Sequence, residues 1–205
     1  MLRPRRPLAG PRRAPAALGF ACQAVQFTPD GMLLVGGAQL AVVDPATGEV
    51  RKRATVLDGA SVYGFSRNGR WAVALGADER RARVLSTPGG QPFGVELARP
   101  EALRALSVSN SGQWLAFGWA DGKVVKVVNV ADGAPISPDL PAGGPTSTSF
   151  REDDGQLAVA SWDGTVTTYD TRTWHAAVGA PGRPTIVGSG LHPGLARWVL
   201  VERVP

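Results

Sequence analysis

Residues 147–174 read STSFREDDGQLAVASWDGTVTTYDTRTW, and this stretch decides the fold. An apolar residue, Phe150, precedes a polar turn, and the apolar run LAVAS follows that turn. A second turn, WDG at 162–164, leads into the extended segment TVTTYD. Asp-Gly turns tolerate positive φ and close tight hairpins, so short apolar runs between such turns are typical of antiparallel strands. The stretch therefore predicts a small antiparallel sheet.

The same plan occurs in three earlier segments, 24–50, 61–92 and 106–135. Each has an apolar residue, a polar turn ending in glycine, an apolar strand, a second turn and a third strand. The four turn glycines follow one another at spacings of 38, 43 and 43 residues, and they are Gly31, Gly69, Gly112 and Gly155. The chain is therefore predicted to be a tandem array of repeats of about 43 residues.

A fourth extended piece, such as GAPISPDL at 133–140, completes each repeat. Four short strands with a turn at each junction are typical of one blade of a β-propeller, and such blades must stack on one another to bury their apolar faces. We predict an all-β propeller with about four full blades and a partial fifth. The expected boundaries are a basic Pro/Arg-rich extension at 1–19 and blades at 20–60, 61–104, 105–146, 147–184 and 185–205.

Two motifs point to a family. FTPDG at 27–31 and SWDGTV at 161–166, which closes on Tyr169-Asp170, resemble the repeats of bacterial WD-repeat proteins across roughly residues 20–203. The resemblance implies a non-catalytic scaffold that binds a protein partner. The Gly-His pair that often opens a WD repeat is absent, so the family's Asp-His-Ser/Thr-Trp network cannot be assembled. Only Asp121 and Asp163 correspond to the family's second-turn aspartates.

The predicted ring is incomplete. PTIVGSGLHPGLARWVLVERVP at 184–205 supplies two strands around a turn and then stops within a blade. Four and a half blades are fewer than most WD-type rings contain. Three arrangements remain open: a piece of a longer propeller, a homodimer that completes a ring, or an outer strand for the last blade supplied by residues 4–14.

The charge pattern argues against a nucleic-acid groove. The net charge is +5, but five arginines precede residue 14 without an acidic residue, and the remainder is close to neutral. Binding a phosphate backbone requires basic residues gathered on one folded face. The chain has no apolar run long enough for a membrane helix, and its N-terminal start is too weak for a secretory signal, so a cytoplasmic location is expected.

Three residues are assigned to the interior. Cys22 is the only cysteine, which excludes an internal disulfide and a multi-thiolate metal site, and its strand position predicts a packed thiol. Trp71 and Trp114 each come second after a turn glycine, so we expect them to pack between blades.

Catalytic chemistry has little support in the sequence. The only histidines, His175 and His192, fall in an outer strand and a turn, away from any nucleophile, and neither a metal nor a cofactor is expected. The acidic run at 152–154 lacks the alternating spacing of a calcium loop and is interpreted as a solvated turn. We therefore predict no enzyme. The alternatives are a ligand-binding or hydrolytic propeller that uses its channel face, and a non-functional gene fragment.

A partner is expected on the loops between second and third strands, because loops on a rigid scaffold commonly carry binding function. Trp119 and Trp162 each precede an Asp-Gly turn and are predicted to emerge on the same face of neighbouring blades. Arg80, Arg81 and Arg83 belong to the corresponding loop of the second repeat and are expected to add positive charge. The alternative is that each tryptophan packs over its own hairpin.

Overall fold

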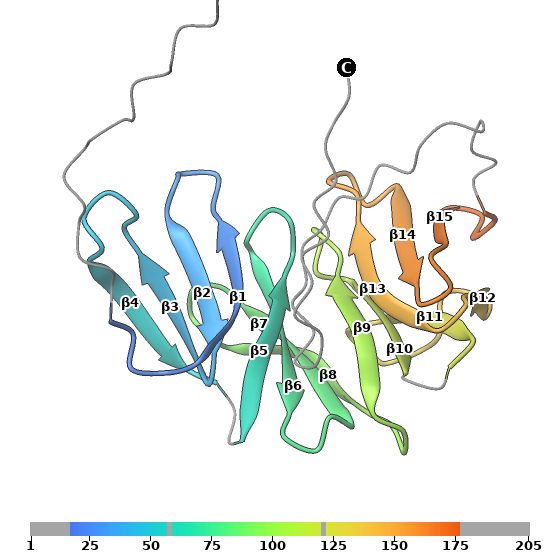
Figure 1. Ribbon diagram of the computed structural model, residues 1–205, viewed down its shortest axis with the longest axis horizontal. Helices are drawn as coiled ribbons and strands as arrows, with labels where there is room; N and C mark the ends of the chain where they lie inside the picture. The colour runs from blue at the N-terminus through green and yellow to red at the C-terminus, as the bar shows by residue number, and fades with distance from the viewer. Residues whose placement is uncertain (1–16, 57–58, 120–121, 177–205) are drawn as a thin grey trace, which may run out of the picture.

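The computed structural model describes residues 17–56, 59–119 and 122–176, and within these ranges it contains fifteen β-strands and no helix. The strands form four antiparallel sheets that follow one another along the chain, and Figure 1 shows these sheets side by side. The chain is thus an all-β propeller with four blades in its described part. The predicted half-blade at 185–205, with His192, and the turn residue Asp121 lie outside the described residues.

Each blade is a meander of strands in chain order. Blade 1 contains β1 (Cys22–Phe27), β2 (Leu33–Gly37), β3 (Gln39–Val43) and β4 (Val50–Thr55). Blade 2 contains β5 (Ala60–Phe65), β6 (Trp71–Gly76), β7 (Arg81–Ser86) and β8 (Pro92–Ala98). Blade 3 contains β9 (Leu103–Val108), β10 (Trp114–Trp119), β11 (Val124–Asn129) and the short β12 (Leu140–Pro141). Blade 4 contains β13 (Pro145–Phe150), β14 (Gln156–Ser161) and β15 (Val166–Asp170).

The first strands of the blades are the inner strands of the propeller. β1 contacts β5, β5 contacts β9, and β9 contacts β13, so these four strands neighbour one another across blade boundaries. The sheet of each blade therefore has one face toward the preceding blade and one toward the following blade. We call these the leading face and the trailing face.

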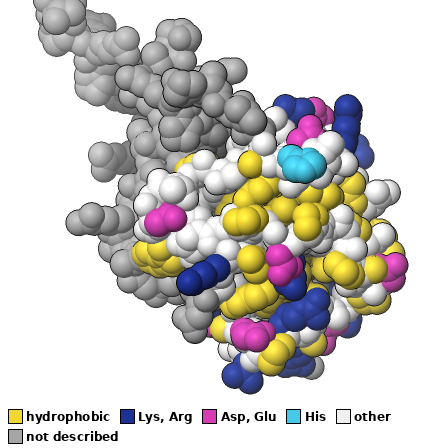
Figure 2. All heavy atoms as spheres, turned by 90° about the vertical axis from the view of Figure 1, so that its right-hand side faces the viewer, with side chains coloured by type: hydrophobic (Ala, Val, Ile, Leu, Met, Phe, Trp, Pro, Cys, Tyr) yellow, Lys and Arg dark blue, Asp and Glu magenta, His cyan; other side chains and the backbone are white. Residues whose placement is uncertain are grey.

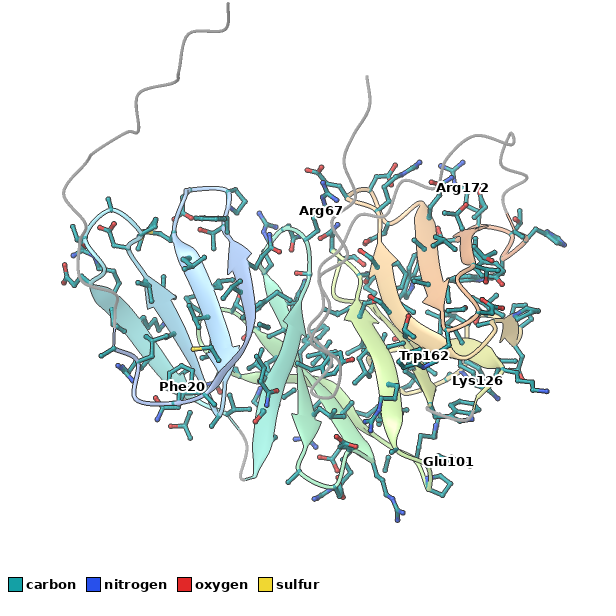
Figure 3. All side chains as sticks on the ribbon, viewed as in Figure 1. Phe20, Arg67, Glu101, Lys126, Trp162 and Arg172 are labelled. Atoms are coloured by element: carbon teal, nitrogen blue, oxygen red, sulfur yellow. The ribbon has the colours of Figure 1, made fainter. Side chains whose placement is uncertain are left out.

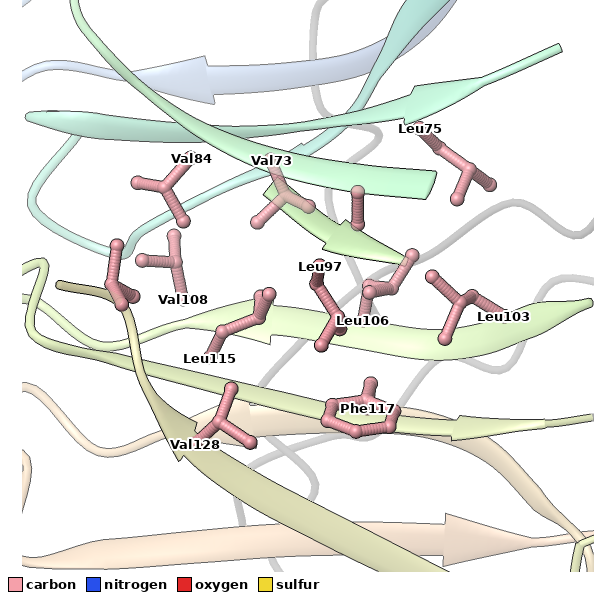
Figure 4. Close-up of a cluster of buried hydrophobic side chains, with 12 residues drawn as sticks. Val73, Leu75, Val84, Leu97, Leu103, Leu106, Val108, Leu115, Phe117 and Val128 are labelled. Atoms are coloured by element: carbon pink, nitrogen blue, oxygen red, sulfur yellow. The ribbon is translucent and has the colours of Figure 1, made fainter. Parts of the chain in front are cut away.

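The core lies between blades and not within one sheet, because side chains alternate between the two faces of a strand. Between blades 2 and 3, Val73 and Val84 on the trailing face of blade 2 belong to the same buried cluster as Phe117 on the leading face of blade 3 (Figure 4). Further clusters fill the spaces between blades 1 and 2 and between blades 3 and 4. Stacking thus buries what one short-stranded sheet cannot bury by itself.

Both predicted interior tryptophans pack between blades. Trp71 lies against the cluster between blades 2 and 3, directly over Gly112 in the first turn of blade 3. Trp114 lies against the cluster between blades 3 and 4, and its ring centroid is 6.2 Å from that of Phe150. The prediction for Cys22 was wrong: the thiol is exposed, because no strand of the described residues covers the part of β1 that carries it.

The first turn of each blade follows one scheme, and the fourth repeat corrects the sequence alignment. Gly31, Gly69 and Gly112 adopt φ angles of 83°, 68° and 76°, and each N–H donates to the carbonyl oxygen three residues earlier. In blade 4 the equivalent residue is Asp154 and not Gly155. Asp154 has a φ of 57°, and its backbone N–H donates to Arg151 O. Aspartate is one of the few residues other than glycine that tolerate this conformation.

Candidate interaction rim

The turns between second and third strands and the connections between blades lie at one end of the antiparallel sheets. We call this end the rim; its described residues are 38, 56, 59, 77–80, 99–102, 122–123, 142–144 and 162–165. Figure 3 shows Trp162 and Glu101 toward this end, and Arg67 and Arg172 at the opposite end. The predicted partner-binding loops are therefore grouped on one side of the propeller by the strand order alone.

Trp162 is the most prominent apolar side chain of the described rim, with 57% of its surface exposed. The backbone N–H of Trp162 donates to Gly144 O at 2.9 Å, which joins the β14–β15 turn to the connection that precedes β13. The next residue fixes the turn: Asp163 Oδ1 accepts bonds from the N–H and hydroxyl of Thr165 at 2.9 and 2.6 Å. The hydroxyl bond is the largest cause that lowers the pKa of the Asp163 carboxyl below its ordinary value. The indole is thus presented on a rigid turn.

Trp119 is placed differently. It ends β10, is half-buried, and lies so close over Gly122 that a Cβ there would stand 2.8 Å from the indole Nε1. Its ring centroid is 6.2 Å from that of Phe117, and the Lys126 ammonium stands 5.9 Å from its ring. Trp119 therefore packs over its own hairpin, which is the alternative that the sequence left open.

The two tryptophans are also not structurally equivalent. Leu115 pairs with Val108 in blade 3 as Leu157 pairs with Phe150 in blade 4, so the blades correspond with an offset of 42 residues. Trp119 then corresponds to Ser161, and Trp162 comes one place later, in the turn itself. Both tryptophans precede an Asp-Gly pair, but Ala120 separates Trp119 from that pair in the sequence, whereas Trp162 directly precedes it.

The three arginines of blade 2 differ in whether they form ion pairs. Arg81 Nε bonds Asp78 Oδ2 at 3.1 Å, and Arg83 Nη2 lies 3.5 Å from Glu96 Oε2 on the neighbouring strand β8. Arg80 is exposed, and within the described part of the chain no ion pair is recorded for it. The hydrogen bond from the backbone N–H of Arg80 is the largest cause that lowers the pKa of the Asp78 carboxyl. Only the guanidinium of Arg80 is therefore presented by this turn without a carboxylate partner among the described residues.

The sequence missed a polar cluster where this turn meets the inner strands. Glu79 Oε2 bonds Arg104 Nη1 at 2.7 Å, and the Glu79 carbonyl accepts the Leu103 N–H at 2.6 Å. Tyr63 lies close to this pair, and burial raises the pKa of its phenol above the ordinary value. The partners are distant in sequence and Glu79 has a φ of 56°, so neither a motif nor glycine marked the place. The cluster anchors the β6–β7 turn to blade 3.

The described residues contain no group of three or more His, Cys, Asp or Glu side chains arranged to hold a metal ion. His175 is the histidine that they include, and it is exposed. Figure 2 shows this side of the molecule, where apolar side chains gather among charged ones. Both hydrogen bonds of His175 within the described residues are made by its backbone. The His175 carbonyl accepts the Asp170 N–H at 3.0 Å, and the backbone N–H of His175 donates to Thr173 Oγ1 at 3.4 Å. Among these same residues, no helix has the length and apolar character needed to cross a membrane.

The acidic run at 152–154 serves the structure of the turn. Arg151 binds Asp153 through two bonds of 2.6 Å, from Nε to Oδ1 and from Nη2 to Oδ2. The Glu152 carbonyl accepts a bond of 2.7 Å from the Asn110 side-chain amide. Asp154 accepts the N–H groups of Asn110 and Ser111 in blade 3 at 2.7 and 2.8 Å. The run therefore joins blades 3 and 4.

The carboxyl of Asp153 is expected to titrate far below its ordinary range. The Arg151 guanidinium lowers the pKa of Asp153 from 3.8 to about 2. A lowered folded-state pKa contributes stability above pH 3.8 and loses it as the pH falls toward 2. A carboxyl-detected NMR titration should give a midpoint near pH 2, and Arg151→Gln should move it back toward 3.8. A midpoint that stays unchanged in this variant would show that the guanidinium is not the cause.

No protein-family model matches the chain, and no curated protein matches it. Solved structures do. The computationally designed Ika4 protein is similar with 21% identity and a TM-score of 0.56, covering 77% of this chain and 95% of its own. The β-propeller domain of Cps50 (Swd1) from Myceliophteria thermophila is similar with 15% identity and a TM-score of 0.56, and the match covers 71% of this chain but only 52% of that domain. Likenesses at this identity show the fold: the described chain is a β-propeller segment of four blades.

Proposed function

We propose that this chain is a non-catalytic, WD-repeat-like scaffold that binds a protein partner at the rim around Trp162. The observation that carries the proposal is a large aromatic side chain with 57% exposure on a turn that is fixed by Asp163 and tied to Gly144. Tryptophan buries a large area at little cost in side-chain entropy, and it is enriched among the residues that dominate binding energy. A rigid turn keeps that entropy cost low.

The charges along the rim agree with a protein surface as the ligand. Arg80 is exposed on the β6–β7 turn, and Glu101 is exposed in the connection between blades 2 and 3. Around them, the rim residues Asp78 and Glu79 form ion pairs with Arg81 on β7 and Arg104 on β9. A mixed pattern of this kind suits the polar border of a protein interface better than a polyanion.

The rim can be tested by site-specific photo-crosslinking in cells of the source organism. A photoreactive phenylalanine analogue at position 162 should yield a discrete adduct with one protein. The same analogue at position 172, an exposed residue at the opposite end of the sheets, should not yield that adduct (Figure 3). Identical adducts from both positions, or none from position 162, would remove the support for this rim.

Once the crosslinked protein is purified, Trp162→Ala is expected to weaken its binding about 30-fold, because central aromatic anchors contribute about 2 kcal/mol or more. Isothermal titration calorimetry would measure the Kd. Val95→Ala is the control, since Val95 is an apolar residue with 43% exposure on the outer strand β8, away from the rim. Equal affinity of the Trp162→Ala variant and the native chain would disprove the assignment.

A further inference from the structure

The leading face of blade 1 has an uncovered apolar strip on its inner strand. Val25 and Phe27 are 63% and 60% exposed, the largest values among the exposed large hydrophobic residues of the described chain. Val25 pairs with Val35, and Phe27 pairs with Leu33, so all four side chains share this face. The strip is therefore part of a blade face and does not belong to a loop.

The corresponding residues of the other blades are covered. Phe27 corresponds to Phe65, Val108 and Phe150, the last residues of the inner strands. Val108 and Phe150 are 3% and 4% exposed, and Phe65 packs against the cluster between blades 1 and 2. In each case the cover is the trailing face of the preceding blade. Phe27 is exposed because no strand of the described residues covers it in this way.

The structure shows what kind of surface provides that cover. Gly36 on the trailing face of blade 1 lies so close to blade 2 that a Cβ at position 36 would collide with Val62 and stand 3.0 Å from the Phe65 ring. Gly118 on the trailing face of blade 3 lies equally close to Pro145 of blade 4. At these two contacts, a glycine of the second strand thus receives the inner strand of the next blade, whereas Leu75 holds the corresponding place on blade 2.

The connection that enters blade 1 packs on the leading face in the same way as the connections that enter blades 2 and 3. Leu18 and Phe20 pack against the cluster of Val35, Ala41 and Val43 on the leading face. Val56, four residues before β5, takes the same place on blade 2, where it is 3% exposed. Arg99, four residues before β9, stands 5.4 Å from the Phe117 ring on the leading face of blade 3. The segment at 18–20 therefore does not cover the strip of Val25 and Phe27. The connections that enter blades 2 and 3 likewise do not cover the inner strands that follow them.

Blade 4 carries the complementary surface. Ala158 and Ala160 on β14 pair with Thr168 and Val166 on β15, and these four side chains form its trailing face. Ala160 corresponds to Gly36 and Gly118, three places beyond the residue paired with the end of the inner strand. No strand follows β15 within the described residues. Blade 4 thus ends the described arc with a small-residue face like those of blades 1 and 3, and blade 1 begins it with an uncovered inner strand.

We propose that two copies of this chain close a ring, with the strip of Val25 and Phe27 in each copy packed on the Ala158 and Ala160 face of the other. The arrangement has two-fold symmetry and two identical contacts, which cover the strip and the complementary face of both copies. Eight blades lie within the range that propellers adopt. This contact is separate from the rim at Trp162 and does not depend on what binds there.

The mass of the 205-residue chain in solution tests the inference. Light scattering after size exclusion should give twice 21.4 kDa at micromolar concentration. Phe27→Asp and Ala160→Arg should each give 21.4 kDa. An equimolar mixture of the two variants should recover the dimer, because one of its two contacts is then native and the other pairs the introduced carboxylate with the introduced guanidinium.

The controls separate this contact from other causes. Val95→Asp places the same charge on an exposed apolar position of β8 and should remain dimeric. Trp162→Ala should also remain dimeric, so failure of the rim proposal leaves this result intact. Since Phe27 is exposed, circular dichroism of Phe27→Asp should match the native spectrum. A monomeric native chain, an open-ended polymer, or a Phe27→Asp variant that stays dimeric would each overturn the proposal.

Discussion

Replacing Phe117 with alanine is expected to lower the free energy of unfolding by about 3–5 kcal/mol. Phe117 is fully buried, and its ring lies in the cluster that joins blades 2 and 3. Trp119 and Arg99 both stand against this ring, so its removal opens a cavity whose lining is held by two blades. A cavity between two rigid sheets collapses poorly, which places the expected loss in the upper part of the range for large apolar side chains.

Urea unfolding followed by tryptophan fluorescence would measure the loss. The matched control is Phe93→Ala, the same truncation at a side chain with 39% exposure, where the ring contact with Trp71 limits the expected loss to about 1 kcal/mol. If both variants lost the same stability, the stacking of blades 2 and 3 through Phe117 would not be the dominant contribution.

The repeat made the fold predictable, because it is visible as a fixed succession of apolar runs and turn residues. WAVALG and WLAFGW alternate too little to reveal a solvent face, and both proved to be second strands buried on two sides. A strand between two blades has no solvent face. The periodic turns therefore carried more information about the architecture than polarity along any one strand.

Individual side chains were less predictable where a turn residue changed. Alignment on glycine assigned the turn position of blade 4 to Gly155, which Asp154 holds. Trp119 and Trp162 looked equivalent because each precedes an Asp-Gly pair. The strand register shows that one ends a strand while the other lies in a turn. Cys22 was assigned to the interior by its strand position, but burial of an inner strand depends on a preceding blade. Local sequence does not report whether that blade is present.

The β13–β14 turn supplies the second strong test, since Asp154 combines two roles that glycine and alanine would separate. Its carboxylate accepts the N–H groups of Asn110 and Ser111 from blade 3, and its backbone holds a φ of 57°. Bonds from N–H groups to a carboxylate contribute about 1.5–3 kcal/mol each when well shielded, and this half-buried site lies toward the low end. Asp154→Ala loses both bonds and keeps the unfavourable φ, so a loss of about 2–3 kcal/mol is expected.

Asp154→Gly should lose the same bonds but relieve the backbone, which makes it about 1 kcal/mol more stable than Asp154→Ala. Asp154→Asn should lie between the native chain and Asp154→Gly, because an amide retains one acceptor and tolerates positive φ. Asp153→Ala, whose carboxylate bonds only within its own turn, should change the urea midpoint little. A glycine variant as stable as the native chain would mean that the bonds to Asn110 and Ser111 contribute nothing. The predicted order would instead show that aspartate stands at a glycine position because it joins two blades there.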